Sequence, residues 1–262
     1  MRSLKARLSA PDGGPVNGLF CSTPAALTIE LIAAAGYDFV VIDLEHTLID
    51  GAQLGAMLLA ARASGIAALV RVAATHHVAP ALDAGAQGIV FPRINGVAQA
   101  RQAARLCHYA QHPLGAGSMP GERGLNATLH SAFGRDDLAA AAADAGRNTL
   151  VVAMIEDGAA LDALDDIASV PGIDVLLEGA ADLSQSMGVP WQTRHPQVRA
   201  AVVRIADAAR RHGKHFCALP RAPEDAALWR QQGTRMLLLG DDRGIARRAM
   251  AAHLQSHSQS PT

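Results

Sequence analysis

The chain has 262 residues, a formal net charge of −1 at pH 7 and 50% hydrophobic residues. This balance excludes a basic nucleic-acid surface and an acidic tail, and no uncharged run approaches the roughly 20 apolar residues that span a bilayer. No apolar segment of signal-peptide length follows the basic N-terminus. We therefore expect a soluble, cytoplasmic protein that binds neither nucleic acid nor membranes.

Short apolar runs typical of strands alternate along the chain with longer alanine- and leucine-rich stretches of helical periodicity. After a surface helix at about residues 1–10, the pattern predicts strands at 18–21, 39–43, 67–71, 88–91, 150–155, 173–177, 214–219 and 236–239. Helices are predicted at 24–35, 51–64, 77–84, 97–109, 137–145, 161–168, up to residue 212, and at 224–232. A glycine- and proline-rich loop covers 111–126, and a polar tail from about 256 to 262 is expected to fray.

Eight strand–helix units predict one closed (β/α)8 barrel, the TIM-barrel fold, which commonly takes about 250 residues. Residues 1–262 are therefore expected to form a single domain. In such a barrel the carboxyl ends of the strands open on one face, where active sites are built. Polar side chains that follow the predicted strands are expected to gather there: Asp43, Glu45, His46, Arg71, Arg93, Glu156, Glu178, Asp182, Arg221 and Asp241.

Two of these carboxylates follow neighbouring strands of the predicted barrel. Glu156 comes directly after the fifth strand, and Asp182 lies just past the sixth. Together they could bind a hard divalent cation such as Mg²⁺, which takes one or two carboxylates and leaves positions for water or substrate. The alternative is that both are helix N-caps, because carboxylates are favoured before helices.

Arg71, Asp43 and His46 are the other candidates for chemistry. Arg71 ends a buried strand, where a guanidinium needs an anionic partner. It either neutralises neighbouring carboxylates or binds a substrate carboxylate or oxyanion in bidentate fashion. His46 follows Asp43 by three residues, so that carboxylate could orient the imidazole as an acid or base. Otherwise His46 is simply a polar residue at the strand exit.

Several segments resemble the HpcH/HpaI aldolase and citrate lyase family in order and spacing over almost the whole chain: Gly36-Tyr37-Asp38-Phe39-Val40-Val41-Ile42-Asp43-Leu44-Glu45-His46, Leu69-Val70-Arg71-Val72, Leu82-Asp83-Ala84-Gly85-Ala86-Gln87-Gly88, and Met154-Ile155-Glu156 with Ala181-Asp182-Leu183-Ser184. The resemblance implies a barrel in which Glu156 and Asp182 hold a divalent metal, Mg²⁺ or alternatively Mn²⁺ or Co²⁺. It implies that Arg71 binds a 2-oxo acid and that His46 with Asp43 transfers protons.

The same resemblance implies a homo-oligomer, a dimer or hexamer whose subunits exchange their C-terminal helices. Asp83 would then lie near the active site of a neighbouring subunit. Two positions depart from the pyruvate aldolases of the family, which usually carry a glutamine in place of Met154 and Gly-Pro-Ala-Asp in place of Gly179-Ala180-Ala181-Asp182. Both departures lie beside the expected metal pair.

Longer strings resemble instead the branch of the family that makes citrate for siderophore assembly, as in the staphyloferrin B pathway: Glu178-Gly179-Ala180-Ala181-Asp182-Leu183-Ser184, Pro190-Trp191-Gln192-Thr193-Arg194-His195-Pro196, Phe216-Cys217-Ala218-Leu219-Pro220-Arg221 and Leu239-Gly240-Asp241-Asp242-Arg243-Gly244-Ile245. This resemblance implies condensation of oxaloacetate with acetyl-CoA, a coenzyme A thioester. The residues expected to bind substrate are Arg71, Glu45, Ala181, Trp191, Asp83 and, for its position after the seventh strand, Arg221. The alternatives are a metal-dependent class II pyruvate aldolase for 4-hydroxy-2-oxo acids and a catalytically silent carboxylate-binding barrel.

Overall fold

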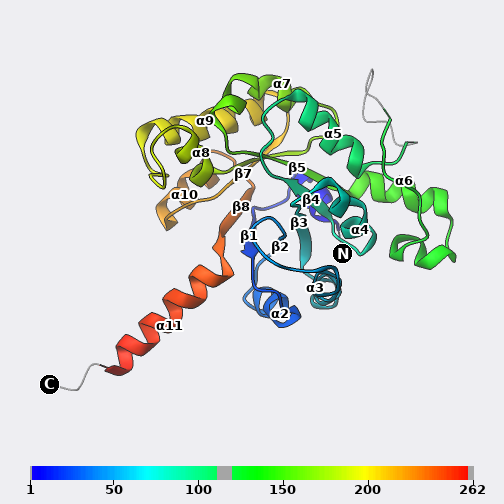
Figure 1. Ribbon diagram of the computed structural model, residues 1–262, viewed down its shortest axis with the longest axis horizontal. Coiled ribbons are helices and arrows are strands. Elements are labelled where there is room, and N and C mark those ends of the chain that lie inside the picture. The colour runs from blue at the N-terminus through cyan, green and yellow to red at the C-terminus, as the bar shows by residue number, and fades with distance from the viewer. Residues whose placement is uncertain (1, 111–119, 259–262) are drawn as a thin grey trace.

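Eight parallel strands, each paired with the next in chain order, form the centre of the computed structural model, which describes residues 2–110 and 120–258 (Figure 1). Pairing of β8 with β1 closes the sheet, so the predicted (β/α)8 barrel is confirmed. The strands are β1 (Val16–Cys21), β2 (Phe39–Asp43), β3 (Ala67–Arg71), β4 (Gly88–Phe91), β5 (Leu150–Ile155), β6 (Val175–Glu178), β7 (His215–Ala218) and β8 (Met236–Asp241).

Helices between the strands lie around the barrel, one helix precedes β1, and the last helix follows β8 (Figure 1). They are α1 (Leu4–Ser9), α2 (Ala26–Ala34), α3 (Gly51–Ser64), α4 (Val78–Asp83), α5 (Val97–Cys107), α6 (Leu138–Asn148), α7 (Leu164–Ser169), α8 (Ala180–Ser186), α9 (Pro196–Arg211), α10 (Pro223–Gln231) and α11 (Asp242–Ser258). Three 3₁₀ segments accompany them: η1 (Thr75–His77), η2 (Leu129–Gly134) and η3 (Gly158–Ala163). Neither α8 nor η2 is among the helices predicted from the sequence.

The ends of α3 show how local sequence defines an element. The Asp50 side chain accepts the Gln53 N–H at 2.8 Å, and the Gln53 side chain accepts the Asp50 N–H at 2.9 Å. This reciprocal capping box satisfies two main-chain donors that the first helical turn leaves without partners. Gly65 ends the helix with a φ of 70°, a left-handed conformation that glycine adopts without steric cost.

The expected N-terminal surface helix is instead a plug. Leu4 and Leu8 of α1 are 1% and 0% exposed and pack with the side chains that fill the barrel interior. The Lys5 ammonium lies 2.8 Å from the Asp174 carboxylate, just before β6, and the Leu4 N–H donates to the Gln87 side chain, just before β4. α1 therefore covers the end of the barrel at which the strands begin, opposite the face expected to carry the active site.

Alternate residues of each strand point into the barrel, and this alternation decides which strand-end residues reach its mouth. Asp43, Arg71 and Glu156 each lie two residues beyond an inward-facing apolar side chain, so they form a polar layer above the apolar interior. Glu178 directly follows the inward-facing Leu177 and therefore points outward. The expectation that all strand-exit residues share one face is wrong for Glu178.

The C-terminal helix α11 extends away from the barrel (Figure 1). Met250 and Leu254 on this helix are 70% and 67% exposed. Residues 256–258 of the tail expected to fray are helical, whereas residues 259–262 and positions 111–119 of the predicted loop lie outside the described residues. Within the described ranges, none of the helices has the length and apolar character required to cross a bilayer.

Candidate active site at the barrel mouth

Asp43 and Arg71 form a buried ion pair at the mouth. They are register partners at the ends of β2 and β3, and they are 2% and 8% exposed. Arg71 Nε donates to Asp43 Oδ1 at 2.9 Å, and Arg71 Nη2 lies 2.8 Å from Asp43 Oδ2. The guanidinium is also 4.8 Å from the centre of the Phe20 ring. Of the two roles considered for Arg71, neutralising a neighbouring carboxylate is therefore present in the structure.

The Asp43 carboxylate also holds the loop that follows β2. The main-chain N–H groups of Glu45 and His46 donate to Asp43 Oδ1 at 3.0 and 3.4 Å. Burial opposes ionisation of Asp43, but the hydrogen bonds and charge of Arg71, with these two N–H groups, lower the pKa of its carboxyl. Asp43 is thus an ionised anchor for both Arg71 and the loop.

The imidazole of His46 lies beside Glu45, which corrects the expected pairing of that ring with Asp43. His46 Nε2 is 3.8 Å from Glu45 Oε2, whereas the contact between His46 and Asp43 runs through the His46 main chain. The physical reason is that the Asp43 oxygens are already occupied by Arg71 and main-chain donors. The His46 side chain is 55% exposed, so its ring is open to solvent at the mouth.

Glu45 is the central carboxylate of the cluster. Its Oε2 lies 3.3 Å from Arg71 Nη1, and its Oε1 lies 3.5 Å from Arg93 Nε. Oε2 is nevertheless buried without a hydrogen-bond partner in the structure. A buried carboxylate oxygen that lacks a hydrogen bond is costly, and such atoms commonly mark a functional site. Glu45 therefore has an acceptor available for a bound group.

Glu156 reaches the mouth from the end of β5. Its Oε1 accepts the Arg93 N–H at 2.7 Å, and Arg93 is held at a φ of 55°, which is uncommon outside glycine. A Cβ on Gly179 would come within 2.5 Å of Glu156 Cβ and 2.8 Å of Glu156 Oε2, so a side chain at position 179 would displace this carboxylate. From the sequence Arg93 is expected only as one of the polar residues at the strand exits, and its hydrogen bond to Glu156 is seen only in the structure.

The charges of the neighbouring carboxylates Glu45 and Asp182 affect the pKa of Glu156. Burial, together with the charges of Glu45 and Asp182, raises the pKa of Glu156 to about 7 against the opposing effects of the Arg93 N–H and Arg71. Mutually repelling carboxylate oxygens, one of them without a hydrogen bond, suit a hard divalent cation. Within the described part of the chain no cluster of three or more potential metal ligands occurs.

Neither Glu156 nor Asp182 is a helix N-cap in the structure. Asp182 lies inside the first turn of α8, two residues beyond its first residue, so it is not the N-cap. Asp157, and not Glu156, caps η3, because its side chain accepts the Ala159 N–H at 2.9 Å. The helix N-cap alternative therefore applies to neither carboxylate.

The other residues predicted to bind substrate occupy different places. Ala181 lies in the first turn of α8, Arg221 is exposed beyond β7, and Trp191 is 82% exposed on the loop between α8 and α9. Asp83 ends α4, and its carboxylate pairs with Arg123 Nη2 at 2.7 Å. Because α4 runs back toward the start of β4, Asp83 lies at the opposite end of its own barrel from the mouth. Substrate binding by these residues stays a prediction.

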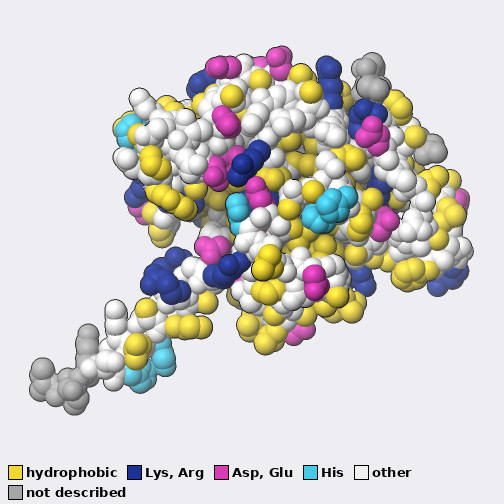
Figure 2. Space-filling view, in the orientation of Figure 1, with side chains coloured by type: hydrophobic (Ala, Val, Ile, Leu, Met, Phe, Trp, Pro, Cys, Tyr) yellow, Lys and Arg dark blue, Asp and Glu magenta, His cyan; other side chains and the backbone are white. Residues whose placement is uncertain are grey.

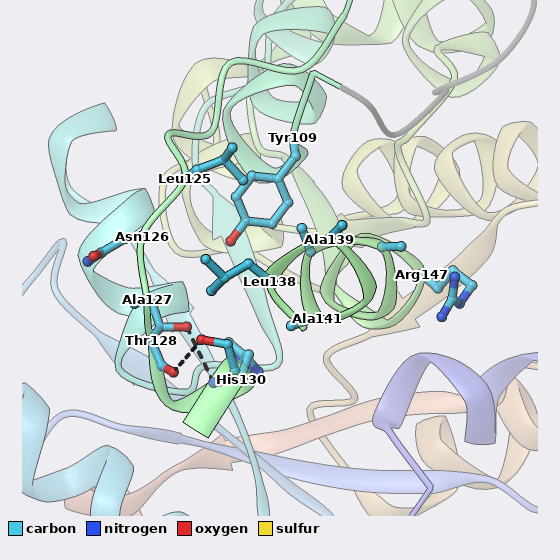
Figure 3. Close-up of a pocket in the computed structure, with 13 residues that line it drawn as sticks. Tyr109, Leu125, Asn126, Ala127, Thr128, His130, Leu138, Ala139, Ala141 and Arg147 are labelled. Carbon is cyan, nitrogen blue, oxygen red and sulfur yellow. Dashed lines mark hydrogen bonds between the residues drawn. The ribbon is translucent and has the colours of Figure 1, made fainter. Parts of the chain in front are cut away.

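Charged side chains gather near the middle of the face shown in Figure 2, where acidic, basic and histidine groups lie over the labelled strands of Figure 1. A cavity of about 780 Å³ lies elsewhere, between residues 125–131 and α6. In Figure 3, Leu125 and Leu138 face Tyr109 there, and alanines of α6 line the wall. Alanine and leucine side chains form much of its lining, so the mouth remains the candidate active site for an oxo acid.

Residues 17–249 match the family described as HpcH/HpaI aldolase/citrate lyase. The chain belongs to this family. The solved structure of the citrate synthase SbnG is 43% identical and superimposes with a TM-score of 0.87 over 98% of both chains. A solved HpcH/HpaI aldolase/citrate lyase family protein from Burkholderia cenocepacia is 32% identical, with a TM-score of 0.88 over 99% of this chain and 100% of that one.

Aldolases of the HpcH/HpaI family are also similar to this chain. The hydroxypyruvate/pyruvate aldolase of Paraburkholderia phytofirmans is 34% identical over 91% of each chain. Citrate synthases and aldolases both act on carbon–carbon bonds, so this member of the family is a carbon–carbon bond-forming enzyme.

Proposed function

We propose that this protein is a citrate synthase for siderophore biosynthesis, which converts oxaloacetate, acetyl-CoA and water into citrate and coenzyme A. The observation that carries the proposal is the 43% identity with the citrate synthase SbnG over 98% of both chains, against 34% with the bacterial hydroxypyruvate/pyruvate aldolase. The mouth geometry supports the same chemistry, because it combines fixed positive charge, carboxylates and an exposed imidazole.

Arg71 provides the fixed positive charge. Asp43 holds two of its nitrogens in a bidentate pair, and the remaining nitrogen, Nη1, lies toward the mouth beside Glu45. In the proposed reaction, the keto oxygen of oxaloacetate becomes negative as the new carbon–carbon bond forms. A guanidinium already held in place stabilises that charge without having to reorganise during the reaction. Arg71 thus binds the oxo acid and stabilises the transition state.

His46 is the proposed acid–base group. One methyl proton must leave acetyl-CoA so that the methyl carbon can attack the keto carbon, and the developing alkoxide must gain a proton. The exposed His46 ring can approach either atom, and its Nε2 lies 3.8 Å from Glu45 Oε2. Water then cleaves the thioester, which releases coenzyme A and citrate.

Glu156 and Asp182 would hold the divalent metal that the resemblance implies. When bound, a Mg²⁺-type ion supplies Lewis-acid polarisation of the oxo-acid oxygens. The protein itself orients these carboxylates: the Arg93 N–H fixes Glu156 Oε1, and the bare Cα of Gly179 leaves room for the Glu156 side chain. Arg221 is proposed to bind the second carboxylate of oxaloacetate, with Ala181 and Trp191 completing the pocket.

Direct product analysis tests the proposal. Purified protein is incubated with acetyl-CoA and oxaloacetate, free thiol is measured over time, and citrate is identified by mass spectrometry. We expect equal amounts of free coenzyme A and citrate, and we expect EDTA to abolish the reaction and Mn²⁺ or Mg²⁺ to restore it. Folded protein that forms no citrate with either ion present would refute the proposed function.

A class II pyruvate aldolase is the second candidate, favoured by the 34% identity with the hydroxypyruvate/pyruvate aldolase. It predicts consumption of pyruvate that depends on an added aldehyde and stops with EDTA, without any coenzyme A thioester. Parallel assays with the two substrate pairs distinguish the candidates, because only one pair would give turnover at low substrate concentration.

The proposed enzyme is a homo-oligomer in which α11 is exchanged between subunits. Two features support this. First, α11 extends away from its own barrel with Met250 and Leu254 exposed. Second, Leu27 and Leu31 on the outer side of α2 are 62% and 60% exposed, an apolar surface that a helix from another copy could cover.

A further inference from the structure

Glu178 is a buried carboxylate that does not face the mouth. It is 3% exposed at the end of β6, with its side chain on the outer side of the barrel wall. Its Oε1 accepts the Leu219 N–H at 2.8 Å, and its Oε2 accepts the Ala180 N–H at 3.2 Å. Burial raises the pKa of Glu178, while the charge of Arg221 and these two N–H groups oppose the rise. Both carboxylate oxygens of Glu178 therefore accept hydrogen bonds from main-chain N–H groups, one after β7 and one at the start of α8.

The two segments that Glu178 joins carry proposed site residues. Ala180 begins α8, and Asp182 follows in the same first turn. Leu219 comes directly after β7, and Arg221 follows two residues later. One carboxylate thus connects the backbone that supports a proposed metal ligand with the backbone that supports a proposed substrate ligand.

The described main-chain pairing of β6 with β7 does not extend to Ala180 and Leu219. In the described strands, the register between β6 and β7 ends at the pair of Leu177 with Cys217. Beyond that pair, the Glu178 side chain accepts the Leu219 N–H. Without it, the Ala180 and Leu219 N–H groups would lose these acceptors at a partly buried position.

We propose that Glu178 is a positioning residue that sets the relative placement of Asp182 and Arg221, an inference that rests on the function proposed above. A carboxylate suits the role because two N–H donors need two acceptor oxygens. A glutamine has one acceptor oxygen and one N–H₂ group, so one of the two N–H groups would face another donor. Glu178→Gln therefore keeps the size of the side chain but breaks one of the two connections.

The experiment compares Glu178→Gln and Glu178→Ala with Asp174→Asn. Asp174 offers a matched control because it accepts the Val151 N–H at 2.9 Å at the opposite end of β6, beside the plug helix. The readouts are Mn²⁺ affinity of the protein without substrate, measured by electron paramagnetic resonance, and KM for oxaloacetate and kcat measured separately. All are taken well below the unfolding temperature of each variant.

We expect Glu178→Gln to weaken Mn²⁺ binding and raise KM for oxaloacetate by about 10- to 100-fold, the usual effect of removing a partner that orients a ligand. Asp174→Asn should lower thermal stability while leaving Mn²⁺ affinity and KM within about twofold of wild type. Unchanged Mn²⁺ affinity and KM in folded Glu178→Gln would overturn the inference. If Glu178→Ala does not fold, Glu178→Gln alone decides.

Failure of the proposed function would be distinguishable from failure of this inference. Wild-type protein that makes no citrate would refute the function, yet the Mn²⁺ measurement would still report whether Glu178 positions Asp182. Wild-type protein that makes citrate, together with a Glu178→Gln variant of normal KM and Mn²⁺ affinity, would refute the positioning role alone.

Discussion

At the scale of single residues, the mouth is built around the bidentate pair of Arg71 with Asp43. The pair anchors Arg71, and the main-chain N–H groups of Glu45 and His46 tie the following loop to the same carboxylate. Arg93 then links this group to Glu156 through its main chain and to Glu45 through its side chain. A change at one of these residues should therefore affect the others.

Replacement of Arg71 tests this coupling. Arg71→Ala leaves the Asp43 carboxylate buried without its partner, so we expect the free energy of unfolding to fall by about 3–5 kcal/mol. Citrate formation should fall at least about 100-fold, because the charge that stabilises the transition state is gone. Urea unfolding and steady-state assays measure the two effects. Arg210→Ala, which removes an exposed pair with Asp207, is the control and should change neither by much.

The pKa of Asp43 predicts a dependence of stability on pH. Because the folded protein lowers this pKa below 3.8, the ionised carboxylate stabilises the fold above that value. The stabilisation is lost as the pH falls from about 4 through the lowered pKa, since the unfolded chain takes up the proton first. We expect the difference in unfolding free energy between wild type and Asp43→Asn to shrink with falling pH over this range. A difference that stays constant would contradict this explanation.

At the scale of elements, the local sequence pattern predicts the strands and most helices, including the six-residue helices α1, α4 and α7. It does not predict α8, which has seven residues and begins without a side-chain N-cap. α1 has a recognisable helical spacing of Leu4 and Leu8, but what covers those leucines depends on strands that lie much later in the chain. The partners of apolar helix faces are therefore decided by the assembled barrel.

Leu8 provides a direct test of the plug. Leu8→Ala removes a fully buried side chain from the closed end of the barrel, so we expect the free energy of unfolding to fall by about 2–5 kcal/mol. Leu59→Ala is the matched control on α3, where the side chain is 56% exposed, and should cost much less. Equal effects of the two substitutions in urea unfolding would show that α1 does not contribute to the core as described.

At the scale of the whole molecule, the exposed apolar side chains of α11 and α2 bear on the proposed assembly. Double substitution of Met250→Glu and Leu254→Glu should convert the oligomer to monomers, because two charges cannot be buried against an apolar surface without large cost. Analytical ultracentrifugation measures the change. Gln255→Glu adds a charge to the same helix at an exposed polar position and should leave the oligomer intact. A monomeric wild type would contradict the exchange.

The sequence alone determined the barrel and most of the residues at its mouth, because a short apolar run that ends in a charged residue is a local property of each strand. Asp43, Arg71 and Glu156 could be placed in this way. Only the tertiary structure decided that Glu45 lies nearest the His46 ring and that Glu178 points outward to join α8 with the end of β7. These contacts depend on which side of the barrel wall a side chain faces and on closure of the barrel. Closure brings together groups that are distant in sequence, and no local sequence pattern gives the distance between them.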